Sequence, residues 1–200
     1  MIGRIQGIIL EKLPPELVID VNGVGYEINA SMNTFYHLPE VGEKVSLHTH
    51  FVVREDAQLL YGFVDKEERT LFRTLIKVNG VGPQLALTIL SSVTPMEFAH
   101  YVADNNNAAL VKLPGVGKKT AERLIIEMRD KLKGAAFGID AAAQTDLLTI
   151  PIHNSPEQEA ISALIALGYK PQEASKAVSK VNITNLSSQE IIRQALKSQA

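Results

Sequence analysis

The chain is organised around one stretch, Leu113-Pro114-Gly115-Val116-Gly117-Lys118-Lys119-Thr120-Ala121-Glu122-Arg123-Leu124-Ile125. Its two glycines permit backbone conformations that other residues rarely adopt, which predicts a tight turn. From Thr120 onward, apolar residues recur at spacings of three and four, which predicts an amphipathic helix. The unpaired amides of a helix N-terminus favour an anion, and Lys118 and Lys119 add positive charge there. The stretch therefore predicts a phosphate-binding turn.

The same pattern occurs earlier in the chain, at a constant offset of 35 residues. Gly80-Val81-Gly82 aligns with Gly115-Val116-Gly117, and Ala86 aligns with Ala121. A helical run precedes each turn, at residues 68–77 and 107–113. A repeat at a fixed offset indicates two copies of one supersecondary unit. Helix, glycine hairpin and helix, twice over, resembles the helix-hairpin-helix family, whose members bind the DNA backbone.

A third Gly-Val-Gly, at residues 23–25, lies between two β-type runs, and no basic helix follows it. We interpret it as an ordinary hairpin turn. No stretch matches the phosphate-binding pattern Gly-x4-Gly-Lys-Ser/Thr, because Gly115 to Thr120 lacks the first glycine at the right distance. We therefore do not expect ATP hydrolysis by this chain.

Composition limits the class of protein. The 200 residues are enough for one to three small domains, and 46% of them are hydrophobic. The absence of cysteine excludes disulfides and thiolate metal sites and favours a reducing compartment. No apolar run reaches the length of a membrane span, and residues 1–5 lack the features of a signal peptide. We therefore expect a cytoplasmic protein without a membrane segment.

The formal net charge of −2 is unevenly distributed. Residues 1–64 carry 4 basic and 8 acidic side chains, residues 65–134 carry 11 and 8, and residues 135–200 carry 5 and 6. The basic excess therefore falls in the segment that holds both glycine hairpins. Such asymmetry favours a polyanionic ligand, although a small basic excess is also typical of a solvated face.

Residues 1–64 alternate between apolar and polar positions, as β-strands do. We expect an OB-like five-stranded barrel, with another small antiparallel sheet as the alternative. One helical turn is expected at residues 32–37. The expected strands cover residues 4–10, 16–21, 25–30, 45–53 and 58–63.

The connection Arg54-Glu55-Asp56-Ala57 joins the last two strands. It has three interpretations: a solvated hairpin tip, a pair of carboxylates that repels phosphate where DNA strands converge, and a metal-dependent nuclease site. The third is the weakest, because neighbouring strand residues point to opposite faces. The five histidines, among them His48 and His50 on one strand face, show no metal-ligand spacing.

The remaining chain reads as helical, so the expected fold class is multidomain α+β. Residues 65–134 form the tandem helix-hairpin-helix segment, 135–155 a flexible linker, and 156–200 a three-helix unit. The Leu-Gly-Tyr turn of this last unit resembles those of ubiquitin-associated bundles, which bind proteins. The candidate partner-binding residues are Leu164, Leu167, Tyr169 and Leu196.

The whole chain resembles the RuvA family of bacterial Holliday-junction-binding proteins. An OB-like barrel, two hairpin motifs, a loose linker and a small helical unit occur there in this order. The stretches that carry the resemblance are Met1-Ile2-Gly3-Arg4-Ile5-Gln6-Gly7, Phe51-Val52-Val53-Arg54-Glu55-Asp56-Ala57, Leu60-Tyr61-Gly62-Phe63 and residues 113–124.

The resemblance implies fourfold-symmetric tetramers, of which one or two hold a four-way junction open for recombination, DNA repair and the SOS response. It implies no cofactor and no catalytic residue, and it implies the hexameric ATPase RuvB and the resolvase RuvC as partners. Glu55 and Asp56 match the family's acidic pin, and Gln84 departs from the lysine that many relatives carry. The implied DNA-binding residues are Gly80, Val81, Gly82, Gly115, Val116, Gly117, Lys118, Lys119, Thr120 and Arg123.

Two other classes of function are kept as alternatives. Helix-hairpin-helix motifs also occur in DNA glycosylases and nucleases, which need a nucleophile beside a base pocket or a metal cluster. Asp130 is the carboxylate that we nominate for this role, and its expected solvent-facing position argues against it. A single-strand binder that uses the barrel is the other alternative. The acidic barrel, with few aromatic residues to expose, argues against it.

Overall fold

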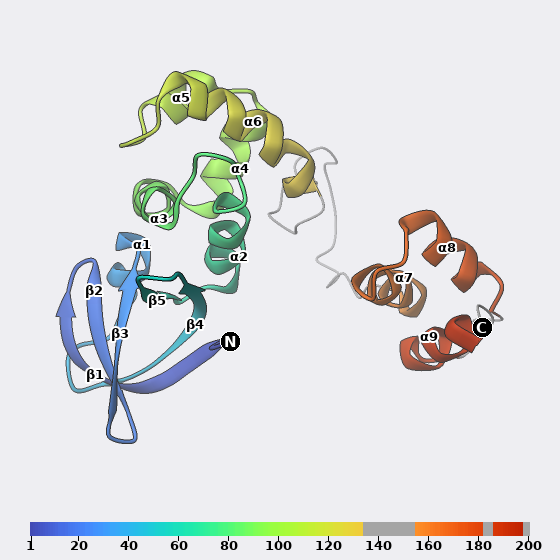
Figure 1. Cartoon of the computed structure of the whole chain (residues 1–200), viewed down its shortest axis with the longest axis horizontal. Coiled ribbons are helices and arrows are strands. Elements are labelled where there is room, and N and C mark those ends of the chain that lie inside the picture. Colours follow the sequence, from blue (N-terminus) through green and yellow to red (C-terminus); the bar gives the residue numbers. More distant parts are fainter. Residues whose placement is uncertain (134–154, 182–185, 198–200) are drawn as a thin grey trace, which may run out of the picture. The chain divides into compact units, whose positions relative to one another are not determined.

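The computed structural model describes residues 1–133, 155–181 and 186–197. The chain divides into two compact units, of which the first holds β1–β5 and α1–α6 and the second holds α7–α9. The fold is mixed α+β, with a barrel followed by helices, as the sequence predicts (Figure 1). The expected linker, residues 135–155, lies outside the described residues except for Ser155.

The first five strands form a closed barrel in the order β1-β2-β3-β5-β4, which confirms the predicted OB-like barrel. Strands β3 and β5 pair in parallel, and the other neighbours are antiparallel. Alternate residues such as Leu17 and Ile19 on β2 are fully buried inside. The strands are β1 (Arg4–Leu13), β2 (Glu16–Val21), β3 (Val24–Ala30), β4 (Lys44–Val53) and β5 (Gln58–Phe63).

The third Gly-Val-Gly is a hairpin turn, as predicted. It connects β2 to β3, with Asn22 at φ 53° and Gly23 at φ 90°. Two consecutive residues with positive φ are typical of the two-residue turns that match the twist of antiparallel strands. The sequence Gly-Val-Gly thus occurs at a turn between two strands here and at turns between two helices elsewhere in the chain.

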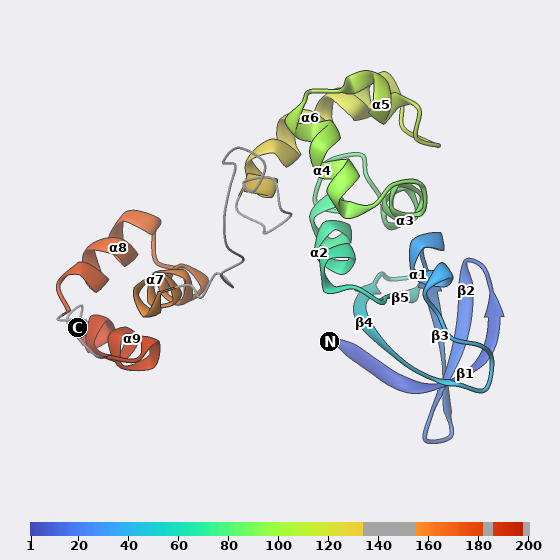
Figure 2. The same cartoon turned by 180° about the vertical axis from the view of Figure 1, so that it is seen from behind.

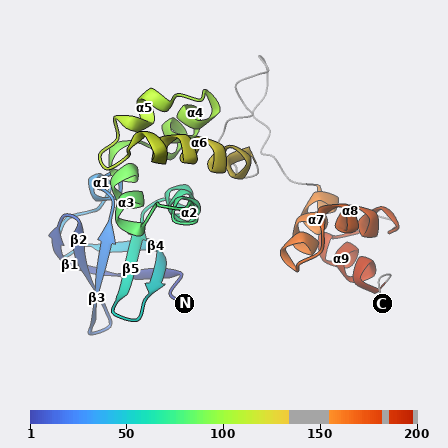
Figure 3. The same cartoon turned by 45° about the horizontal axis from the view of Figure 1, so that its top comes forward.

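Among its described residues the first unit also has six helices, and α2–α6 share one hydrophobic core that includes Phe72, Phe98, Leu124 and Met128. The sequence Thr94-Pro95-Met96-Glu97 predicts a capping box, and helix α4 begins with one, in which Thr94 and Glu97 bond each other's backbone amides. Figure 3 shows α4, α5 and α6 together, away from the barrel. The helices are α1 (Met32–Tyr36), α2 (Lys66–Leu75), α3 (Pro83–Ser92), α4 (Pro95–Ala103), α5 (Asn107–Val111) and α6 (Lys118–Lys133).

A buried polar network joins the barrel to the helices. Glu68 of α2 is 3% exposed, and it accepts hydrogen bonds from the hydroxyls of Ser31 and Thr34 at the start of α1. Asn33 Nδ2 donates to Leu90 O of α3 at 2.6 Å. Figures 1 and 2 show α3 over α1 in both views. Because α1 is held by both α2 and α3, the hairpin between them has a fixed place relative to the barrel.

The second unit contains α7 (Pro156–Ala166), α8 (Pro171–Ser179) and α9 (Ser188–Lys197) among the residues described. Its small core is made largely of alanines and includes Leu164, Val178 and Ile191. Ser155 caps α7, because its hydroxyl accepts a hydrogen bond from the Gln158 amide at 3.3 Å. The predicted helices at this end of the chain are therefore present.

Candidate nucleic-acid interface

The two glycine hairpins have the same backbone geometry. Hairpin 1, residues 78–82, connects α2 to α3, and hairpin 2, residues 113–117, connects α5 to α6. Their first glycines have positive φ, 87° at Gly80 and 78° at Gly115. A side chain is strained in this region, so these positions require glycine for the fold itself.

The second glycine of each hairpin is not required by the fold. Gly82 has an ordinary φ of −82°. A Cβ atom added to Gly82 or Gly117 would meet no atom within 4 Å. The space above both backbones is therefore open, and another group can approach the peptide closely.

Between the glycines, Val81 and Val116 face inward. Their side chains are 4% and 5% exposed and belong to the helical core. Their amides are also engaged, since Val81 N donates to Val78 O at 3.0 Å and Val116 N donates to Leu113 O at 3.1 Å. Both valines hold the turn in shape, and neither offers its side chain or its amide hydrogen to a ligand.

The positive charge gathers at hairpin 2. Helix α6 begins at Lys118, two residues before the predicted start, so Lys118 and Lys119 are its first two residues. Both are exposed, and Thr120 is half-buried. Ala121 N donates to Gly117 O at 2.9 Å, so the amides of residues 118–120 precede the first bond of the helix. Free amides and two ammonium groups together suit a phosphate.

Arg123 links the two hairpins. From α6 it reaches hairpin 1, where Nη1 donates to Asn79 O at 2.9 Å. In the other direction, a Cβ added to Gly115 would lie 3.0 Å from Leu85 Cδ1 of α3. The helix after each hairpin thus contacts the other hairpin. Asn79 and Leu85 were not predicted from the sequence, because contacts between repeats leave no local signal in it.

The acidic loop is a tight turn between β4 and β5, closed by a hydrogen bond from Arg54 N to Ala57 O at 2.8 Å. Glu55 and Asp56 are both exposed at its tip. Among the described residues, no group of three or more His, Asp or Glu side chains could hold a metal ion. The side chain of Asp130, the carboxylate nominated for the enzyme alternative, lies outside the described part of the chain.

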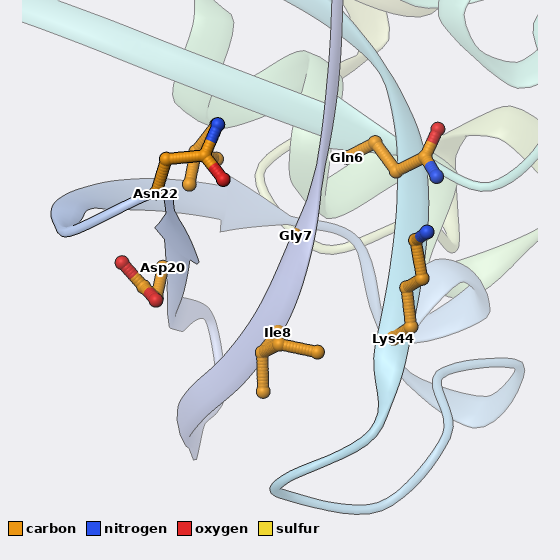
Figure 4. Close-up of a pocket in the computed structure, with 7 residues that line it drawn as sticks. Gln6, Gly7, Ile8, Asp20, Asn22 and Lys44 are labelled. Carbon is orange, nitrogen blue, oxygen red and sulfur yellow. The ribbon is translucent and has the colours of Figure 1, made fainter.

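A shallow hollow of about 500 Å³ lies on the barrel, between β1, β2 and β4 (Figure 4). Its polar lining consists of Gln6, Asp20, Asn22 and Lys44. None of its lining residues comes from the helices that carry the hairpins. The hollow is therefore separate from the candidate interface.

The candidate partner residues of the second unit differ in exposure. Leu164 is 1% exposed and packs in the core, so its side chain is unavailable to a partner. Leu167 is 63% exposed, and its neighbour Ile165, which sequence reasoning missed, is 41% exposed. Tyr169 and Leu196 are half-buried against the core. In the described parts of both units, no helix is long and apolar enough to cross a membrane.

Comparison with known proteins gives matches along most of the chain. Three family models match: the RuvA N terminal domain at residues 1–62, a SAM-like helix-hairpin-helix tandem at 72–130, and the RuvA C-terminal domain at 155–198.

Curated relatives match over nearly the full length. A protein from Shewanella sp. (strain MR-7) is 57% identical over 99% of both chains, and one from Escherichia coli O9:H4 (strain HS) is 56% identical over 98% of both. One from Vibrio parahaemolyticus is 56% identical over 99% of both. Each is described as Holliday junction branch migration complex subunit RuvA. At this identity and coverage, the chain belongs to the RuvA family.

Proposed function

We propose that this chain is the DNA-binding subunit of a branch migration complex, which binds a four-way junction and holds it open without catalysing a reaction itself. The observation that carries the proposal is the pair of hairpins whose second glycines, Gly82 and Gly117, leave open space above the backbone. The relatives' description as branch migration subunits supports the same function.

Binding is independent of base sequence. The groups that suit phosphates are backbone amides, positive charges and one hydroxyl, and phosphate contacts position a protein without specifying a base sequence. The amides belong to Gly80, Gly82, Gly115 and Gly117, and the charges and the hydroxyl belong to Lys118, Lys119, Thr120 and Arg123. Val81 and Val116 act only through the shape of the turn, because their side chains are buried. Affinity falls steeply with salt, because each phosphate contact releases counterions.

Selectivity for a junction comes from symmetry. Four copies of a weak duplex-binding site, one for each arm of the junction, bind as one multivalent site. The assembly is therefore a homotetramer, and a second tetramer can enclose the junction from the other side. Glu55 and Asp56 act as an acidic pin, whose fixed negative charge repels phosphates at the crossover and keeps strands apart.

The last unit of the chain serves partners. We divide the whole chain into a barrel at residues 1–64, a DNA-binding segment at 65–134, a linker at 135–155, and a partner-binding unit at 156–200. In the last unit, Leu167 is the exposed anchor for a RuvB-type ATPase, with Tyr169 and Leu196 at its edge. A RuvC-type resolvase acts on the same junction, and the site of action is the cytoplasm.

A competition gel shift tests the proposal. Labelled four-way junction bound by the full chain is challenged with excess linear duplex in about 0.15 M salt. We expect the junction complex to survive, because duplex engages only part of a fourfold site. If duplex competes equally per base pair, the chain is a general duplex binder instead.

A second experiment distinguishes the role of the acidic pin from that of the two hairpins. Glu55→Gln with Asp56→Asn removes the charge at the loop tip and leaves the hairpins unchanged. Binding to duplex should be equal or tighter, and preference for the junction over duplex should fall. Full selectivity in this variant would return the loop to an ordinary solvated turn.

A further inference from the structure

The chain contains two Asn-Gly pairs, and each of them lies in a turn. Asn22-Gly23 connects β2 to β3, and Asn79-Gly80 lies in hairpin 1. All four residues are exposed. An asparagine that precedes glycine can react with its own backbone, because glycine has no Cβ atom to obstruct the approach of its amide nitrogen to the asparagine side chain. The two turns hold this nitrogen in different ways.

The reaction of such a pair is deamidation. Hydroxide takes the proton of the glycine amide, and the nitrogen's electron pair attacks Cγ of the asparagine. A bond from this nitrogen to Cγ forms and closes a succinimide ring, while the bond from Cγ to the side-chain nitrogen breaks. That nitrogen takes a proton from water and leaves as ammonia, which restores the hydroxide. Water then opens the ring at either carbonyl and gives aspartate or isoaspartate, so the reaction consumes water, releases ammonia and needs no oxidant or reductant.

In the turn between β2 and β3, the glycine amide is already engaged. Gly23 N donates to Asp20 Oδ1 at 2.7 Å, and Figure 4 shows Asp20 and Asn22 at this turn. The negative charge of the carboxylate stabilises the N–H group and disfavours the anion that forms when its proton leaves. Val21 and Val24 are paired across the two strands, which restricts rotation of the backbone between them. Deamidation should therefore be slow at Asn22.

In hairpin 1, the corresponding amide is free. Within residues 1–133 and the other described ranges, neither Gly80 N nor the side chain of Asn79 makes a hydrogen bond. The amides on both sides are engaged, since Val78 N donates to Leu75 O at 2.9 Å and Val81 N donates to Val78 O at 3.0 Å. The turn is thus held in place around a pair whose nucleophile and target are both unpaired.

Arg123 places a positive charge on the same peptide group. Its Nη1 donates to Asn79 O at 2.9 Å, and a Cβ added to Gly80 would lie 3.4 Å from the same nitrogen. Asn79 O and Gly80 N belong to one resonance-stabilised peptide, so negative charge that forms on the nitrogen is shared with this oxygen. The guanidinium therefore stabilises the reactive anion, as a donor in an oxyanion hole does. This electrostatic effect is opposite to that of Asp20 on Gly23.

We propose that Asn79 is a site of spontaneous deamidation and that Arg123 promotes the reaction there. The product places a carboxylate in hairpin 1, and isoaspartate also adds its side-chain methylene to the backbone. Both changes come directly before Gly80, whose φ of 87° shapes the turn, and close to the open space above Gly82. Deamidated copies should therefore bind DNA more weakly. This consequence rests on the proposed function, whereas the chemistry at Asn79 does not depend on it.

Ageing of the full chain without DNA tests the chemistry. The protein is kept at mildly alkaline pH, and peptides from timed samples are analysed by mass spectrometry, with a protein isoaspartate methyltransferase as a second readout. Asn22 is the internal control, because it has the same neighbour and is equally exposed to solvent in the same sample. We expect Asn79 to convert at least about tenfold faster than Asn22. Equal rates, or a faster reaction at Asn22, overturn the proposal.

Two substitutions test the physical causes. Arg123→Gln removes the cation and should slow conversion at Asn79 by about tenfold. Arg129→Gln, an exposed position on the same helix with the same charge change, is the matched control and should leave this rate unchanged. Asp20→Ala frees the other glycine amide and should speed conversion at Asn22 alone. An unchanged or higher rate at Asn79 in Arg123→Gln overturns the role of Arg123.

DNA binding is measured separately by gel shift. Asn79→Asp should weaken junction binding by about tenfold, because the new carboxylate repels phosphates. Asn79→Gln has a longer side chain that closes a ring slowly, so this variant should keep its own starting affinity through the same ageing. Bound junction should also slow conversion at Asn79, because DNA covers hairpin 1, and should leave Asn22 unaffected.

These measurements separate failure of the inference from failure of the proposed function. An Asn79 that does not convert overturns the inference and leaves junction binding intact. Conversion at Asn79 without loss of affinity and without protection by DNA supports the deamidation site and contradicts the proposed role of hairpin 1 in binding.

Discussion

Hairpin 1 and hairpin 2 share a backbone and differ in chemistry. Both have a first glycine with positive φ, a buried valine whose amide closes the turn, and a second glycine beneath open space. Hairpin 2 then begins its helix with Lys118 and Lys119, whereas hairpin 1 begins with Pro83 and Gln84. Proline has no amide hydrogen, so hairpin 1 offers one donor fewer as well as no charge.

The repeat therefore preserves the shape of the turn more strictly than its charge. Arg123 increases the asymmetry, because it belongs to the helix of hairpin 2 and yet holds the backbone of hairpin 1 at Asn79. Hairpin 1 thus contributes mainly an approachable backbone, and hairpin 2 contributes the charge. Four predictions test this comparison.

The largest effect is expected from Lys118→Glu with Lys119→Glu. These changes place negative charge at the phosphate site of hairpin 2, so junction and duplex binding should both weaken by at least about 100-fold, with a salt slope lower by about 2 per subunit. Gel shifts across a salt series measure both quantities. Lys176→Glu with Lys180→Glu carries the same charge change and should bind like wild type. An unchanged slope would show that the lysines do not contact DNA.

Alanine substitutions of the hairpin glycines are expected to have the next largest effect, on stability at the first glycine of each hairpin and on DNA binding at the second. Gly80→Ala and Gly115→Ala should lower the free energy of unfolding by about 1–2 kcal/mol each, because their positive φ strains a side chain. Gly82→Ala and Gly117→Ala should leave stability within about 0.5 kcal/mol and still weaken DNA binding by about tenfold, because the new methyl occupies the approach to the backbone. Urea unfolding and gel shifts measure the two properties. Normal binding by Gly82→Ala and Gly117→Ala would show that nothing approaches these glycines.

Gln84→Lys should make hairpin 1 more like hairpin 2. The new ammonium group lies in the first turn of α3, so low-salt affinity should rise a few-fold and the salt slope should steepen by about 0.9 per contact. Gln84→Met has a similar length without charge and serves as the control. If the lysine and methionine variants bind alike, hairpin 1 does not face a phosphate at this position.

The smallest effect on binding is expected from Glu68→Gln, which changes the buried polar network that joins the barrel to the helices. Burial raises the pKa of Glu68 above the ordinary value of a glutamate, against the opposing hydrogen bonds from Ser31 and Thr34. The stability that this carboxyl contributes is fully present below its unfolded pKa and is lost as pH rises through its folded pKa. Glutamine stays neutral, so the unfolding free energy of the variant relative to wild type should rise as the pH increases above the ordinary pKa of a glutamate, about 4.3.

Urea unfolding at several pH values measures this change. Glu67→Gln, at an exposed neighbouring position, should show no such trend. A constant difference between Glu68→Gln and wild type would mean that Glu68 does not change protonation on folding. DNA binding by the folded variant should equal that of wild type.

Local sequence patterns were enough to predict the strands and helices and their order along the chain. Alternation predicted five strands, and β2 and β5 have the predicted limits. The Thr94-Pro95-Met96-Glu97 cap and the glycine spacing predicted where α4 begins and where the hairpins lie. These features depend on residues within about four positions of each other, so the sequence displays them directly.

The site was predicted only in part. The sequence placed the glycines, Lys118 and Lys119 at the two turns, where the structure has them. It also treated Val81, Val116 and Leu164 as candidate contact residues, and their side chains are buried. A valine in a turn and a leucine on a helix look alike whether they face a partner or the core, because orientation depends on what packs against them.

The repeated hairpins, the barrel strands, the uneven charge and the membership of a family all follow from the order of residues along the chain. Three contacts follow only from the folded arrangement: Arg123 holds Asn79, Leu85 packs on Gly115, and Glu68 joins the barrel to the helices. These contacts join residues at least thirty positions apart, and their geometry exists only when the barrel and the shared helical core have formed.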